Sequence, residues 1–145
     1  MSLTLRSPLV IRVMRAVFVL LLVLVTVLSL IPNPDAVPGA NAFSRWVAQL
    51  LFGDPLHGDK VSHFIAYGVI GGAGILAALK PFGRIWTLPV LLVAFSGLIE
   101  ICQGLTAARQ PDLADMVANA GGVSAGMLAA AGLVLLFGGS PQRTS

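Results

Sequence analysis

The side chains able to bind an ion or transfer a proton form three short series along the chain. Within each series the residues repeat at intervals of three or four, which places them on one face of a helix. The series are Asp59, Lys60, His63 and Tyr67, then Glu100 and Gln103, then Asp112, Asp115 and Asn119, and Arg109 lies just before the last series. If successive apolar stretches cross the membrane in alternating directions, all three series lie on the same side of the membrane. The pattern predicts one shared ligand-binding site.

These residue types allow more than one kind of chemistry. Lys60 and Arg109 could hold an anion, and the planar guanidinium of arginine suits phosphate. Glu100 or Asp115 could act as a general base, with His63 as the acid, on a phosphate or amide bond. His63, Glu100 and Asp115 could also bind a metal, but a single histidine is a thin basis. No metal or other cofactor is therefore expected.

Each series also has a purely structural interpretation. Asp59 and Asp112 could cap the helices that follow them, and capping is the favoured role for Asp112. His63, Tyr67 and Asn119 could form hydrogen bonds between helices, as polar residues often do within membranes.

The composition indicates a membrane protein. Hydrophobic residues make up 57% of the 145 residues, charged residues make up 10%, and the mean hydropathy is +0.91. So few charged side chains could not cover a water-exposed surface of this size. The formal net charge is +3, but the basic residues are scattered at the ends of apolar stretches, so no nucleic-acid partner is expected.

Four apolar stretches are long enough to cross a bilayer, which takes about 20 residues of helix. They cover about residues 13–31, 61–79, 85–105 and 115–137. The predicted fold is an all-α integral membrane protein with four transmembrane helices, in a single domain over residues 1–145. Between the first two spans, apolar residues recur at helical spacing from Phe43 to Leu51. This segment is expected to be a short interfacial amphipathic helix, or else a helix packed over the bundle.

The basic residues predict the orientation. The side that carries six of them is cytoplasmic by the positive-inside rule, so both termini are expected in the cytoplasm of a bacterial-type inner membrane. These residues are Arg6, Arg12, Arg15, Lys80, Arg84 and Arg143. An alternative is that the first span is a signal peptide cleaved near Ala40-Asn41-Ala42, which would leave three spans.

Small residues predict where helices approach closely. Gly68 and Gly72 in the second span, and Gly122 and Gly126 in the fourth, repeat at the four-residue spacing of close-packed membrane helices.

Three motifs in order resemble the VanZ-like family over about residues 59–126. They are Asp59-Lys60-x-x-His63-Phe64-x-x-Tyr67, then Glu100-x-x-Gln103, then Arg109-x-x-Asp112-x-x-Asp115-x-x-x-Asn119-x-x-Gly122-x-x-x-Gly126. The family is named for a membrane protein associated with resistance to teicoplanin, a lipoglycopeptide that acts on cell-wall precursors. The resemblance implies an antibiotic-resistance or cell-envelope role and supplies no mechanism.

Together the residues and the resemblance predict a membrane protein that binds an amphipathic anionic lipid, cell-wall precursor or lipoglycopeptide. The pocket is expected in the outer leaflet, and the expected partners are a membrane lipid or lipid-linked precursor and the bilayer itself. The alternative is a membrane enzyme that acts on a lipid-linked phosphate or amide through the Glu, His and Asp side chains.

Overall fold

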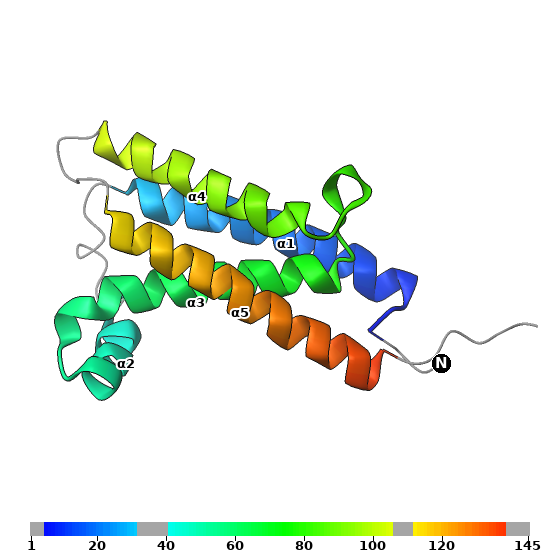
Figure 1. Cartoon of the computed structure of the whole chain (residues 1–145), viewed down its shortest axis with the longest axis horizontal. Helices are drawn as coiled ribbons and strands as arrows, with labels where there is room; N and C mark the ends of the chain where they lie inside the picture. Colours follow the sequence, from blue (N-terminus) through cyan, green and yellow to red (C-terminus); the bar gives the residue numbers. More distant parts are fainter. Residues whose placement is uncertain (1–4, 32–40, 106–111, 139–145) are drawn as a thin grey trace, which may run out of the picture.

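The structure is a computed structural model that describes residues 5–31, 41–105 and 112–138. Every regular element in these segments is helical. The elements are α1 (Pro8–Leu30), α2 (Ala42–Phe52), η2 (Pro55–His57), α3 (Gly58–Leu76), η3 (Pro81–Gly83), α4 (Thr87–Gly104) and α5 (Leu113–Phe137). The four longer helices alternate in direction along the chain (Figure 1).

Within the described residues, three helices are long and apolar enough to cross a membrane, namely α1, α4 and α5. The chain is therefore an all-helical, multi-pass membrane protein. The fourth expected span corresponds to α3, which is not among the three. Its first turns carry Asp59, Lys60 and His63, and glycine and alanine make up much of the rest, so its mean hydropathy is low.

The end of α3 differs from the prediction, which extended this helix to residue 79. The helix ends at Leu76 because Ala78 adopts a left-handed backbone with φ of 52°. The amide of Leu79 then donates to the carbonyl of Gly74 at 3.0 Å, as in helix endings that turn back on themselves. Nε of Arg15 donates to the Ala77 carbonyl at 3.3 Å and satisfies another acceptor at this end.

The predicted close approach of glycines is confirmed between α3 and α5, the pair of helices with the most extensive contact. A Cβ atom on Gly126 would overlap the backbone carbonyl of Gly68, and one on Gly122 would overlap the carbonyl of Phe64. A Cβ atom on Gly72 would lie 3.2 Å from the carbonyl of Gly126. Only glycine lets the two backbones pack this closely.

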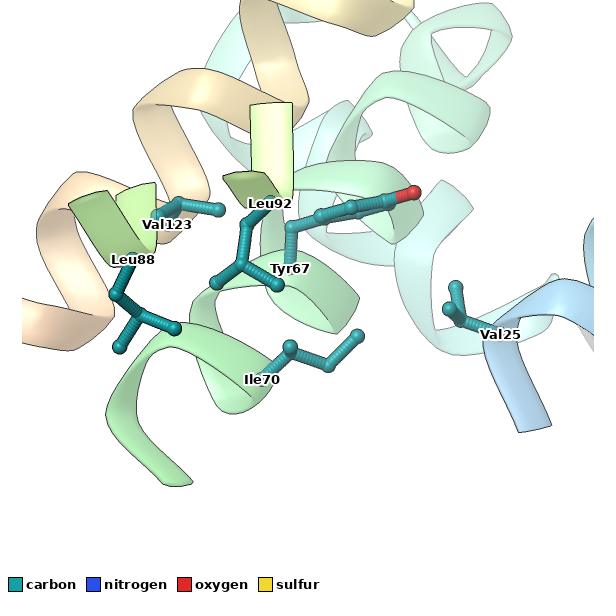
Figure 2. Close-up of a cluster of buried hydrophobic side chains, with 6 residues drawn as sticks. All are labelled: Val25, Tyr67, Ile70, Leu88, Leu92 and Val123. Carbon is teal, nitrogen blue, oxygen red and sulfur yellow. The ribbon is translucent and has the colours of Figure 1, made fainter. Parts of the chain in front are cut away.

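The apolar core lies where α1, α3, α4 and α5 meet (Figure 2). It comprises Val25, Tyr67, Ile70, Leu88, Leu92 and Val123. The ring of Tyr67 is 1% exposed and lies among these side chains. Tyr67 thus contributes to packing as well as to the polar series in which the sequence places it.

The helix α2 packs on the bundle through its small residues. Ser44 and Ala48 are buried, and α2 contacts α3. The apolar residues of α2 point outward instead: Phe43 is 64%, Trp46 59% and Leu50 65% exposed. The helix therefore packs against the bundle, as one of the two alternatives expected, but its apolar face points away from the bundle.

Candidate functional site

The polar series meet at one end of the bundle, where α3 begins, α4 ends and α5 begins (left in Figure 1). Ionic contacts connect Lys60 on α3 to Asp112, the N-cap residue of α5, and to Asp115 in its first turn. A backbone contact connects Glu100 on α4 to Asp112. The prediction that residues distant in sequence form one cluster is confirmed for these side chains.

Lys60 is surrounded by carboxylates. Its Nζ atom donates to Oδ2 of Asp59 at 2.8 Å and to Oδ2 of Asp112. Oδ1 of Asp115 lies 2.7 Å from the same nitrogen, at ion-pair distance although not in hydrogen-bond geometry. Three acidic neighbours match the three donors of an ammonium group. Lys60 therefore holds the acidic residues together rather than presenting a free positive charge.

Asp112 caps α5, as the sequence favours. Its Oδ1 accepts from the amide of Ala114 at 2.8 Å. The hydrogen bond from Lys60, followed by the one from the Ala114 amide, lowers the pKa of Asp112 below its ordinary value. The carboxylate thus stays ionised well into acidic solution.

The capping role considered for Asp59 is wrong. Helix α3 begins at Gly58, with His57 at the N-cap position and no side-chain capping bond. Asp59 lies inside the first turn, and its Oδ1 accepts from the amide of the neighbouring Lys60 at 2.8 Å.

Glu100 is the most deeply buried acidic residue of the cluster, with 3% of its surface exposed. Its Oε2 accepts from the amide of Asp112 at 3.3 Å, a long hydrogen bond. Its Oε1 is buried and has no hydrogen-bond partner. A carboxylate within a membrane bundle is expected to have a basic partner, but no ion pair to Glu100 occurs within residues 5–31, 41–105 and 112–138.

His63 connects α3 to α5. Its Nδ1 lies 3.1 Å from Oδ1 of Asn119, which is 1% exposed. On the other side of the ring, Nε2 lies 3.7 Å from Oδ2 of Asp115. The predicted hydrogen bond between helices is confirmed for this pair.

Gln103 reaches a partner that the sequence did not reveal. It is 3% exposed, and its Nε2 donates to the backbone carbonyl of Ser29 at 2.7 Å. Ser29 lies in the last turn of α1, where the backbone carbonyls have no amide donor within the helix. Gln103 thus connects α4 to the end of α1. Only the presence of a helix terminus near Ile31 hinted at such an acceptor.

The remaining predicted residue, Arg109, lies outside the described residues. Among the described side chains of the cluster, three aspartates contact the one lysine, and Glu100 lies beside them without an ion pair to it. Exposure decreases from Asp59 (52%) and Asp112 (45%) to Asp115 (14%), and Glu100 lies deepest. The described part of the site is therefore an acidic cluster whose members range from exposed to deeply buried at one end of the bundle.

A separate cavity of about 580 Å³ lies near the opposite end of the bundle, between α1 and α4. Its lining is largely apolar, including Phe18 and Leu92, with Arg15 and Lys80 also present. It contains none of the residues that the sequence predicts for the site. We place the chemistry at the polar cluster because that is where ionisable groups converge.

No known protein family, curated protein or solved structure matches this chain in the comparisons made. The assignment of function therefore depends on the geometry of the cluster and on the resemblance of the motifs.

Proposed function

We propose that the chain crosses the bacterial inner membrane four times, with α3 as the additional span and both termini in the cytoplasm. The antiparallel order supports this, because it brings the basic residues Arg12, Arg15, Lys80 and Arg84 to the end opposite the polar cluster. The exposed apolar face of α2 suits the surface of the outer leaflet.

At the polar cluster we propose the binding of an amphipathic anionic molecule. The observation that carries this proposal is a cluster of ionisable side chains accompanied by strongly exposed apolar side chains. Leu105 is 83% exposed, Leu113 75% and Val117 66%, and all three lie close in sequence to the charged residues. A headgroup would contact the cluster while its lipid chain lies along these side chains. A lipid, a lipid-linked cell-wall precursor and a lipoglycopeptide share this chemistry, and the resemblance to the VanZ-like family favours the last two.

Recognition of an anion requires a positive charge that acidic neighbours do not already neutralise, and the described cluster offers none. Lys60 is already paired with acidic residues, so it would have to exchange one of them for the ligand. Arg109 remains the predicted direct ligand for phosphate or carboxylate, since its guanidinium can form paired hydrogen bonds.

A hydrolytic enzyme is the second candidate, and one specific observation favours it. His63, Glu100 and Asp115 present ligand or proton-transfer atoms within 4.8 Å of one another. A histidine beside two buried carboxylates can move protons during cleavage of a phosphate or amide bond. No nucleophilic serine or cysteine belongs to this group.

The binding proposal can be tested by lipid co-purification. The protein would be exchanged into detergent with equal amounts of phosphatidic acid and phosphatidylcholine, and retained lipid would be measured by native mass spectrometry. We expect a preference for phosphatidic acid that Arg109→Gln reduces and Arg84→Gln, at the opposite end, leaves unchanged. No preference in the wild type, or an equal loss in both variants, would contradict the proposal.

A further inference from the structure

The group formed by His63, Glu100 and Asp115 has the donor types of a metal site. Each residue comes from a different helix, α3, α4 and α5 respectively, and their donor atoms lie within 4.8 Å of one another. In a tetrahedral site with bonds of about 2.1 Å, donor atoms lie about 3.4 Å apart. Small side-chain rotations would close this difference.

A second observation, an unpartnered buried carboxylate oxygen, points to a cationic ligand at this group. Oε1 of Glu100 is buried without a hydrogen-bond partner, and Oδ1 of Asp115 has only the ion-pair contact with Lys60. A buried carboxylate that lacks a partner destabilises the folded protein, and a second carboxylate nearby adds repulsion. The described residues provide Glu100 with no cation. A bound divalent ion would satisfy both carboxylates at once.

The histidine is oriented for metal binding. An amide oxygen can only accept, so the contact with Asn119 places the proton of a neutral His63 on Nδ1. Nε2 then directs its lone pair toward Asp115. Metal-bound histidines commonly have their other nitrogen held by such a hydrogen bond, which fixes the ring and its proton.

We propose that Nε2 of His63 and one oxygen each of Glu100 and Asp115 bind a divalent transition metal. One imidazole and two carboxylates suit Zn²⁺, Mn²⁺ or Fe²⁺ better than Mg²⁺ or Ca²⁺, which prefer oxygen ligands alone. Asn119 acts as a positioning residue through His63.

A metal held by three protein ligands keeps a position open for a further ligand. A phosphate or carboxylate oxygen of an amphipathic molecule can take this position, which explains how a cluster rich in carboxylates accepts an anion. This second step rests on the proposed binding function. The metal site itself does not.

Binding of Zn²⁺ tests the site directly. The parent protein would carry His57→Gln and Cys102→Ser, because both side chains could bind Zn²⁺ elsewhere, and it would have no polyhistidine tag. Equilibrium dialysis in detergent after EDTA treatment should show one tightly held Zn²⁺ per chain. Glu100→Gln and Asp115→Asn should each weaken binding tenfold or more, whereas the control Asp54→Asn, on an exposed carboxylate outside the cluster, should change it less than twofold.

Two measurements keep the test independent of variants that fail to fold. Zn²⁺ should raise the unfolding temperature of the parent protein, since it binds the folded state. X-ray absorption of the Zn²⁺ complex should show one imidazole with oxygen ligands. Stoichiometric binding that survives Glu100→Gln, a spectrum without imidazole, or the absence of both binding and stabilisation would overturn the site.

The lipid assay separates the two proposals. We expect retention of phosphatidic acid to fall after EDTA treatment and to return with Zn²⁺. Zn²⁺ binding with lipid retention unaffected by EDTA would overturn the bridging role alone. Zn²⁺ binding without any preference for phosphatidic acid would overturn the proposed binding function and leave the metal site intact.

Discussion

Gly126→Ala should destabilise the protein although it adds only one methyl group. The new Cβ atom would overlap the backbone carbonyl of Gly68, and a backbone cannot rotate away as a flexible side chain can. The helices α3 and α5 would have to separate. Such overpacking typically costs about 1–3 kcal/mol.

Gly132→Ala is the matched control because it lies in the same helix and its Cβ atom would meet nothing within 4 Å. Both substitutions gain about 1 kcal/mol of helix propensity, so the difference between the two variants isolates the cost of the clash. At roughly 2–4 °C for each kcal/mol in a chain of this size, Gly126→Ala should unfold about 2–12 °C below Gly132→Ala.

The assay is thermal unfolding in detergent, followed by the circular dichroism of the helices. Equal unfolding temperatures for the two variants would refute the reasoning, because the close approach of α3 to α5 would then not depend on a glycine at this position.

Three further predictions concern the cluster and the topology. Gln103→Ala should lower stability by about 1–3 kcal/mol by leaving the Ser29 carbonyl unpaired, whereas Gln49→Ala, on the exposed surface of α2, should have little effect in the same unfolding assay. Because the folded pKa of Asp112 is lowered, its contribution to stability is present above its ordinary value of 3.8 and is lost as pH falls below that value, so Asp112→Asn should flatten the acid limb of a stability-against-pH profile. Reporter domains fused after Arg84 and after Leu105 should lie in opposite compartments, and a shared compartment would contradict the assignment of α4 as a span.

The helices themselves were largely predictable, because apolar length and basic flanking residues dominate a membrane sequence. The expected span at 115–137 corresponds to α5 (Leu113–Phe137) and that at 85–105 to α4 (Thr87–Gly104). The end of α3 was not predictable, since no glycine or proline marks the left-handed Ala78. The first turn of α3 is also so polar that its hydropathy is typical of a loop rather than of a membrane helix.

The membership of the site was predictable from helical spacing, but the pairing within it was not. Periodicity places Lys60 and Glu100 at the same end of the bundle, and opposite charges then suggest that they pair. In the structure Lys60 instead lies among aspartates, because Asp59 is in the same helical turn and Asp112 and Asp115 begin α5 beside it. Such pairings depend on how far each helix is rotated about its own axis, and a single sequence does not reveal that rotation.

The closely packed glycines between α3 and α5, which we call the glycine seam, are Gly68, Gly72, Gly122 and Gly126. This seam and the polar cluster form one continuous interface between the two helices. On α3 the seam runs from Gly72 and Gly68 toward the polar end, and the residues that follow at the same spacing are Phe64 and Lys60. On α5 it runs from Gly126 and Gly122 to Asn119 and Asp115. Because the glycines hold the backbones together, short polar side chains can meet across the seam, as the 3.1 Å contact between His63 and Asn119 shows. Residues that contact no ligand therefore determine whether the ionisable groups come within reach of one ion, and the four-residue glycine spacing is part of the site's geometry.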